Sequence, residues 1–323
     1  TFKTFFACLA YSIIIGDTFT SIFVSSGLSP ALATRSNVII ALSSTVLLPL
    51  CSLKNLDALK YTSILGLLGT LYTAAFMVIR YLDGSYVEGG QFFGAVSEAL
   101  RPSFDARTTP GVRLCLFTAY VAHYNAPKFF SELKEKTMTN YNKIVTMGFG
   151  ASIALYFVVM WVGFLQFGGH CSGFILNNYA TADKLATAAR VAIGTGILCG
   201  YPLTFSALRD GVLDLARVKK ADQRGVLIPV TVVLLALLTV GALLLDNVGK
   251  VVSFSGALIG SLLIYIIPAT MNIFNIRRAA TTSTSTSGVT YTPAQKAELL
   301  LNVLIALSGI TVAVFGVAIN LMS

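Results

Sequence analysis

Residues 226–245 read VLIPVTVVLLALLTVGALLL, twenty consecutive residues without a charged side chain. A helix of about 20 mostly apolar residues is long enough to cross a hydrocarbon core about 30 Å thick. The whole chain has a matching composition, because 55% of its 323 residues are hydrophobic, only 11% are charged, and its mean hydropathy is +0.77. Soluble domains carry about 25% charged residues. The sequence therefore predicts an integral membrane protein.

Eight further segments are long and apolar enough to span a membrane. Most mix small residues with aliphatic ones, as in Gly66–Thr70, and small residues let the backbones of transmembrane helices approach closely. We therefore expect an all-α bundle in which residues 1–323 form one transmembrane domain. The nine predicted spans are Phe2–Val24, Ser36–Leu53, Tyr61–Tyr81, Gly111–Phe130, Ile144–Phe167, Leu185–Leu208, Val226–Leu245, Val251–Phe274 and Glu298–Met322.

Basic residues are unevenly divided between the two sides of this predicted bundle. Of the 23 Lys and Arg residues, 15 fall on one side and eight on the other. Cytoplasmic loops carry the excess of Lys and Arg, so we expect Thr1 to lie inside and Ser323 outside or in a lumen. The net charge of +9 then serves orientation and indicates no nucleic-acid partner. No basic segment precedes the first apolar run, so we expect a missing upstream piece rather than a signal peptide.

The sequence contains no catalytic or metal-binding motif. It has two histidines and five cysteines, without CxxC or zinc-type spacing. Only Cys171 lies in a loop, the outer connection Gly168–Lys184, and we expect it to have no partner within the chain. The other long connections are an outer one at Leu82–Pro110 and a flexible, Thr/Ser-rich cytoplasmic linker at Ala279–Lys296. We expect no enzyme activity, no metal site and no cofactor.

The fourth span is the least helix-like. Residues 117–134 read FTAYVAHYNAPKFFSELK, so His123, Asn125 and Pro127 fall close together in an apolar segment. Proline cannot donate to the carbonyl four residues earlier, which is that of His123. Backbone groups freed at membrane depth are tolerated inside protein or beside a watery cavity, and transporters use such broken helices to contact substrate. The alternative is a plain proline kink in which His123 caps a carbonyl.

Two other spans carry polar groups of interest. Asp17 is the one acid deep within an apolar segment, where it favours either a proton or cation site or a structural hydrogen-bond anchor. The sixth span contains Pro202 and hydroxyls such as that of Thr204. These groups can ligate a hard cation such as sodium, or the hydroxyls can bond back to their own helix. Both alternatives stay open for both spans.

Five motifs, taken in order, resemble the amino acid/auxin permease family, and within it the sodium-coupled neutral amino acid transporter group. They are Tyr11–Thr18 (like that group's third helix), Leu48–Leu56 (the end of its fourth), Lys60–Ser63 (the start of its fifth), Phe117–Glu132 (its sixth) and Tyr201-Pro202 with Arg209 (its eighth). The resemblance implies an eleven-helix transporter on the LeuT-like inverted repeat. The nine spans are then helices three to eleven, without the first two.

The resemblance also implies a division of the chain and a site. Residues 1–81 are then a remnant of the first repeat, residues 111–274 the second repeat, and residues 298–322 an additional C-terminal helix. The substrate is an amino acid, held by bare backbone and polar groups. The implied substrate-binding residues are Tyr120, Ala122, His123 and Asn125.

Ion coupling is the point where this sequence departs from the sodium-coupled group. In helix eight those members carry a threonine just before a pair formed by an aromatic or aliphatic residue and a proline. This chain has Gly200 at that position, before Tyr201-Pro202. The loss removes a sodium ligand, which Thr204 or the Cys199 carbonyl can replace. The ion-coupling candidates are Asp17, Gly200 and Thr204, and the ion is H+ or Na+. Besides the substrate and the lipid bilayer we expect no obligate protein partner. The membrane is the plasma membrane or a vacuolar or lysosomal one, and the alternative function is an amino acid sensor or scaffold without net flux.

Overall fold

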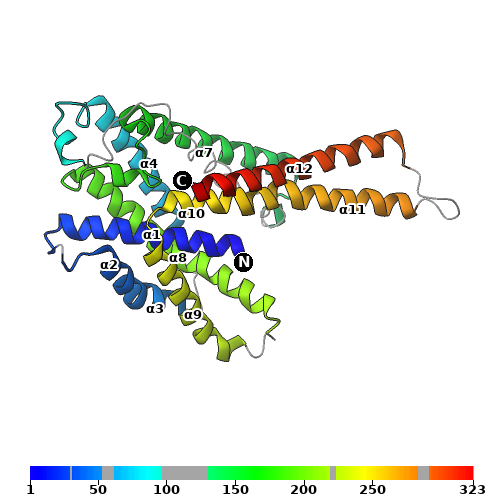
Figure 1. The fold of residues 1–323 in the computed structure, drawn as a ribbon, viewed down its shortest axis with the longest axis horizontal. Coiled ribbons are helices and arrows are strands. Elements are labelled where there is room, and N and C mark those ends of the chain that lie inside the picture. Colours follow the sequence, from blue (N-terminus) through cyan, green and yellow to red (C-terminus); the bar gives the residue numbers. More distant parts are fainter. Residues whose placement is uncertain are drawn as a thin grey trace. The chain divides into compact units, whose positions relative to one another are not determined.

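The computed structural model describes residues 1–29, 31–52, 62–96, 130–131, 133–218, 223–282 and 291–322. Within these ranges the chain is all-helical, without a β-strand, and eight of its helical segments are long and apolar enough to cross a membrane (Figure 1). These segments are α1 (Phe2–Ser25), α2 to α3 (Arg35–Ser52), α4 (Thr62–Leu82), α7 (Met138–Phe167), α8 (Lys184–Leu215), α9 (Gln223–Leu244), α10 to α11 (residues 248–282) and α12 (Pro293–Met322).

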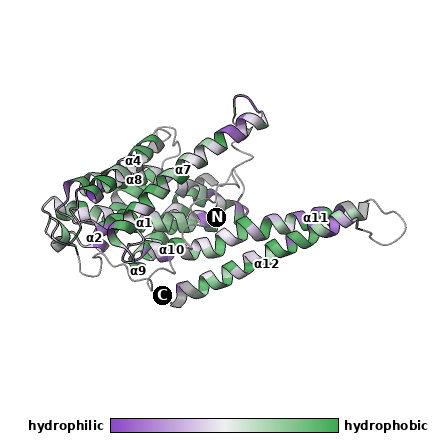
Figure 2. Ribbon diagram, turned by 90° about the horizontal axis from the view of Figure 1, so that it is seen from above, coloured by the Kyte–Doolittle hydropathy of each residue, from purple (hydrophilic) through white to green (hydrophobic). Residues whose placement is uncertain are grey.

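Eight of the nine predicted spans coincide with these segments. The remaining one, Gly111–Phe130, lies outside the described residues except for Phe130. Several helices continue beyond their apolar part, since α8 runs to Leu215 and α12 begins at Pro293. Hydropathy finds the lipid-facing part of a helix, whereas the helix itself ends where its capping groups lie. Figure 2 shows hydrophobic residues predominating along α12.

The start of α12 illustrates such a cap. The Thr292 hydroxyl accepts a hydrogen bond from the Gln295 amide at 3.3 Å, and the Gln295 side chain accepts one from the Thr292 amide at 3.0 Å. This reciprocal pair is a capping box, which satisfies two of the donors that a helix start leaves free. Pro293 is the first helical residue, a position that suits proline because no intrahelical donor is needed there.

Two spans contain wider, π-helical turns. In the second span η1 (Ser43–Leu47) separates α2 (Arg35–Leu42) from α3 (Leu48–Ser52). In the seventh described span η8 (Gly256–Gly260) and η9 (Leu262–Ile266) separate α10 (Val248–Ser255) from α11 (Ile267–Thr282). Both η1 and η9 end two residues before a proline, Pro49 and Pro268. A proline ring meets the carbonyl four residues earlier in a regular helix, and a widened turn relieves this contact.

The chain divides into two compact units. Unit 1 comprises Thr1–Thr109 and Asn142–Val251, and unit 2 comprises Pro110–Tyr141 and Val252–Ser323. In unit 1, α8 packs against both α1 and α4, and α1 also contacts α2 and α9. In unit 2, α12 packs against α11 and η9, where a Cβ on Gly309 would lie 2.6 Å from the Cβ of Tyr265. The lack of a side chain at Gly309 therefore permits this close helix contact.

Unit 1 has an aromatic core at one end. Phe76, Tyr86, Phe167 and Tyr179 are each at most 2% exposed. Their rings meet mostly edge to face, with 4.9 Å between the centroids of Phe76 and Tyr179 and 5.1 Å between those of Phe167 and Tyr179. Edge-to-face contact is the geometry that aromatic pairs favour. The core joins α4, α7 and the loop that contains η7 (Ile175–Asn178), and it holds this end of α8 in place.

Candidate transport site

The predicted site residues fall into two groups. Tyr120, Ala122, His123 and Asn125, predicted to bind substrate, lie outside the described residues. Asp17, Gly200 and Thr204, predicted to take part in ion coupling, lie in α1 and α8, two helices that pack together in unit 1. The described part of the site is therefore the region between these helices.

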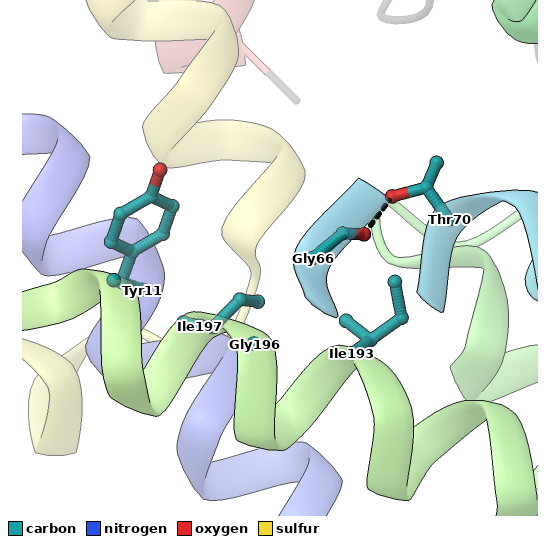
Figure 3. Close-up of a pocket in the computed structure, with 7 residues that line it drawn as sticks. Tyr11, Gly66, Thr70, Ile193, Gly196 and Ile197 are labelled. Atoms are coloured by element: carbon teal, nitrogen blue, oxygen red, sulfur yellow. Dashed lines mark hydrogen bonds between the residues drawn. The ribbon is translucent and has the colours of Figure 1, made fainter. Parts of the chain in front are cut away.

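A cavity of about 300 Å³ lies between α1, α4 and α8. It is lined by Tyr11 from α1, by Gly66 and Thr70 from α4, and by Ile193, Gly196, Ile197 and Gly200 from α8. Figure 3 shows the Ile193 side chain extending from α8 toward Gly66 and Thr70. Gly200 is thus both a predicted ion-coupling residue and part of the cavity wall.

Glycines determine where the helices touch and where they separate. A Cβ on Gly196 would lie 3.1 Å from the Gly66 Cα, and one on Gly69 would lie 3.2 Å from the Ala192 carbonyl, so α4 and α8 are in close contact at these levels. One turn further along α8, a Cβ on Gly200 would meet no atom within 4 Å. The cavity is therefore open on the side of Gly200.

Hydroxyl groups near the cavity are largely occupied within the protein. The Thr70 hydroxyl donates to the Gly66 carbonyl of its own helix at 2.9 Å (Figure 3). The Tyr11 hydroxyl interacts with the Thr204 side chain, which lies one turn beyond Gly200. Thr204 therefore lies one turn from the cavity wall, and its part in ion coupling stays a prediction. Tyr11 is a neighbour that the sequence alone did not indicate.

Asp17 lies in a different environment, an ion-pair cluster between α1, the start of α2, the end of α9 and η7. Its Oδ1 accepts a hydrogen bond from Arg35 Nε at 2.8 Å, and its Oδ2 accepts one from the Asn177 side chain at 3.0 Å. Arg35 also donates to the carbonyls of Ala242 and Leu245 at the end of α9, at 2.9 and 3.1 Å, and to Asp246 at 3.0 Å. Of the two interpretations of Asp17, this geometry supports the structural hydrogen-bond anchor.

Gly16 explains how α1 and α2 come close enough for this pairing. A Cβ on Gly16 would lie 2.5 Å from Ile39 Cγ1 and 3.7 Å from Arg35 Cγ. The pair Gly16-Asp17 therefore provides both the close approach and the partner for the arginine. Asp17 does not line the cavity between α1, α4 and α8, so its part in ion coupling remains a prediction.

Comparison with known proteins identifies the family. Residues 1–318 match the family described as transmembrane amino acid transporter protein. The chain belongs to this family. The match confirms the resemblance seen in the sequence, and the family consists of transporters rather than enzymes, as predicted.

Individual relatives of this chain are similar to it at about the same level. They include vacuolar amino acid transporter 5 of Schizosaccharomyces pombe, 27% identical over 88% of this chain and 66% of its own length. Putative sodium-coupled neutral amino acid transporter 11 of Danio rerio is 26% identical over 82% and 58%, respectively. Sodium-coupled neutral amino acid transporter 7 of Mus musculus is 27% identical over 82% and 59%. The chain thus spans between 58% and 66% of the length of these three relatives.

A second ion-pair cluster in this transporter-family chain was not predicted from the sequence. Asp183, which caps the start of α8, accepts two hydrogen bonds from Arg80, from Nε at 2.8 Å and from Nη2 at 2.7 Å. It also accepts bonds from the Tyr86 hydroxyl at 3.0 Å and the Leu185 amide at 2.9 Å. The Asp183 side chain is 0% exposed, so the cluster ties α4 to α8 through a buried carboxylate.

Arg190 extends this cluster and was the signal in the sequence that could have revealed it. Its guanidinium is buried and donates to the carbonyls of Leu176, Tyr179 and Ala180, at 2.9, 2.6 and 3.3 Å. An arginine within an apolar span requires partners inside the protein. Arg80 and Arg190 are two of the eight basic residues that the charge division places on the outer side. Their positions inside spans predict a buried network.

Proposed function

We propose that this chain is the greater part of a secondary active transporter that moves amino acids across a membrane. The observation that carries the proposal is the match of residues 1–318 to the transmembrane amino acid transporter family. The multi-pass helical architecture and the half-open cavity between α1, α4 and α8 support it. In this proposal the nine predicted spans are helices three to eleven of a LeuT-like inverted repeat, with the second repeat over residues 111–274.

The substrate backbone is held, in this proposal, by the broken helix around Pro127. Unwound backbone carbonyls favour the ammonium group of an amino acid, and helix N-termini favour its carboxylate. Tyr120 and Ala122 supply backbone groups, Asn125 supplies an amide that pairs with either end, and His123 supplies an imidazole. Substituting Asn125 by Ala is then expected to weaken substrate affinity.

The coupling ion in this proposal is the proton rather than sodium, with no other cofactor. Sodium is a hard cation that needs several oxygen ligands. Gly200 contributes no side-chain oxygen to the cavity, and Thr204 is not among the residues that line it. The relatives include transporters named as sodium-coupled and as vacuolar. The membrane of this chain is, in this proposal, either the plasma membrane or a vacuolar or lysosomal one.

The test is uptake of labelled amino acids by the full-length protein in proteoliposomes. We expect accumulation above that of empty liposomes, stimulated by an imposed proton gradient, abolished by a protonophore, and unchanged when sodium is replaced by choline. Stimulation by a sodium gradient alone would overturn proton coupling. Saturable binding without accumulation would instead identify a sensor, the alternative of a different class, and would overturn transport.

A further inference from the structure

The helix pair α11 and α12 of unit 2 carries all of its charge at one end. Residues 252–323 contain four charged residues, and all four are exposed. Three are basic and one is acidic: Arg277, Arg278, Lys296 and Glu298. Figure 2 shows hydrophilic residues near the end of α11 and the start of α12. This end of the helix pair is therefore an exposed basic surface.

One hydrogen bond places the basic residues at a common depth. The Asn272 side chain donates to Glu298 Oε1 at 2.9 Å, so these two residues lie at the same level of the packed, antiparallel helices. At a rise of about 1.5 Å per residue, Lys296 lies about 3 Å beyond this level toward the segment that joins the helices. Arg277 and Arg278 lie about 7.5 and 9 Å beyond it, so the three basic residues fall within a layer about 6 Å deep.

Exposed apolar side chains begin on the other side of the same level. Met271, Leu300 and Leu304 lie there and are 61, 62 and 55% exposed. From Glu298 to Met322, α12 is about 36 Å long at about 1.5 Å per residue, which is enough to cross a hydrocarbon core about 30 Å thick. The level of Asn272 and Glu298 therefore corresponds to the border between hydrocarbon and headgroups.

The layer of basic residues matches the headgroup region in depth and in charge. The headgroup region of one leaflet is about 5–7 Å deep, because a bilayer is about 40–45 Å thick in total and its hydrocarbon core about 30 Å. Arginine pairs with phosphate through two parallel hydrogen bonds. The one acid at this end, Glu298, is already bonded to Asn272. The surface therefore complements the phosphate of a lipid headgroup.

The predicted orientation determines the leaflet. By the distribution of basic residues, the segment Ala279–Lys296 is predicted to be cytoplasmic. Anionic lipids give the cytoplasmic leaflet a negative surface potential, which attracts basic segments next to transmembrane helices. The lipid that this surface meets is then an anionic one.

We propose that the end of the α11–α12 pair binds the headgroup of an anionic phospholipid of the cytoplasmic leaflet through Arg277, Arg278 and Lys296. The occupant is a lipid rather than a soluble phosphate compound, because the exposed apolar side chains beyond Asn272 and Glu298 offer a surface to acyl chains. This inference is independent of the substrate, the coupling ion and transport itself.

The experiment measures lipid binding to the purified full-length protein in a neutral detergent. The probes are short-chain phosphatidylserine, phosphatidylcholine of the same chain length, and glycerophosphoserine, which has the anionic headgroup without the chains. Native mass spectrometry counts the bound lipids, and ligand-induced thermal stabilisation gives a second readout. We expect phosphatidylserine to bind at least about tenfold more tightly than the other two probes, since each nearby Lys or Arg contributes about fivefold at an anionic surface.

Two triple variants with the same loss of charge separate this surface from a basic face in general. One replaces Arg277, Arg278 and Lys296 by Gln. The matched control replaces Lys134, Lys136 and Lys143, exposed residues at the start of α7 that are predicted to lie on the same side. We expect the first variant to lose the preference for phosphatidylserine and the control to keep it within about twofold. Each single substitution in the first set should weaken phosphatidylserine binding by about fivefold.

Glu298→Gln makes the opposite change. It removes the one negative charge and keeps an oxygen that accepts from Asn272, so phosphatidylserine binding should become about fivefold tighter. The Tm without lipid identifies a variant that does not fold, and the single substitutions together with Glu298→Gln then decide the question. Equal affinities for phosphatidylserine and phosphatidylcholine, equal losses in the two triple variants, or equal stabilisation by glycerophosphoserine would each overturn the inference. None of these outcomes affects the uptake assay that tests the proposed function.

Discussion

Substitutions at Gly200 can separate the effect of side-chain size from the effect of a hydroxyl group. Alanine and serine both add a Cβ at a place where it meets no atom within 4 Å, and serine differs from alanine by a single hydroxyl. If the missing hydroxyl is what prevents sodium binding, Gly200→Ser should be stabilised by sodium and Gly200→Ala should not. The measurement is the Tm of each purified variant in sodium chloride and in choline chloride at equal ionic strength. Equal sodium effects in both variants, or none in the serine variant, would argue against this role of the hydroxyl.

Cys171 is a thiol whose reactivity follows from burial. It donates to the Gly163 carbonyl at 3.3 Å, and burial raises its pKa to about 11. Because only the thiolate reacts with maleimides, labelling of Cys171 at neutral pH should be at least about tenfold slower in the folded protein than after denaturation, and it should rise as the pH approaches 11. Peptide mass spectrometry after timed labelling measures this rate. Labelling at the denatured rate would show that the loop around Cys171 is open in solution.

At the scale of helices, Arg80 links two carboxylates of very different exposure. Asp183 is fully buried, whereas the Asp83 side chain is 35% exposed, although both accept hydrogen bonds of 2.7 to 2.8 Å from Arg80. Removing one partner of a buried pair leaves an uncompensated charge and costs about 3–5 kcal/mol, while an exposed pair contributes about 0–1 kcal/mol. Asp183→Asn should therefore lower the free energy of unfolding of the protein far more than Asp83→Asn does.

Thermal unfolding of the two variants in detergent, monitored side by side, checks this prediction. Because both substitutions remove one negative charge near the same arginine, Asp83→Asn is the control for net charge. Similar losses of Tm in the two variants would show that the buried position of Asp183 does not matter. A larger loss for Asp83→Asn would contradict the assignment of Asp183 as the anchor of α8.

The packing of α4 on α8 shows why part of the site could not be predicted. Hydropathy locates both helices, because an apolar span needs only length and composition. It does not reveal that Gly196 lies against Gly66 while Gly200 faces open space, since this depends on the rotation of one helix about its axis relative to the other. Sequence thus provides Gly200 as a candidate, and only the packing shows that it lines a cavity.

Asp17 illustrates a second limit of prediction from sequence. The cost of a carboxylate in an apolar span predicts that Asp17 has a partner, and this is confirmed by Arg35 and Asn177. The identity of the partners depends on a contact between α1, the start of α2 and a loop 160 residues away in sequence. Pairing across such distances follows from the fold. The sequence therefore left the choice between anchor and ion site open.

At the scale of the whole molecule, the predicted span Gly111–Phe130 decides the topology. Glu88 and Glu135 lie on either side of it, and both are exposed. If the segment crosses the membrane once, the two glutamates lie on opposite sides, with Glu88 outside and Glu135 in the cytoplasm by the distribution of basic residues. If the segment does not cross, they lie on the same side, and the number of spans is eight.

Single cysteines introduced into a cysteine-free full-length protein measure this directly. Ala182→Cys and Ala216→Cys are the reference variants, because both positions are exposed and they flank α8, a described span. An impermeant maleimide applied to intact, right-side-out vesicles should label Glu88→Cys and Ala182→Cys, and should label Glu135→Cys and Ala216→Cys only after permeabilisation. The pair around α8 fixes which side each result reports. Labelling of Glu88→Cys and Glu135→Cys from the same side would show that Gly111–Phe130 does not cross the membrane. The broken helix to which Tyr120, Ala122, His123 and Asn125 are assigned would then be wrong. Opposite sides with the reversed sign would keep the span and the site but invert the predicted orientation.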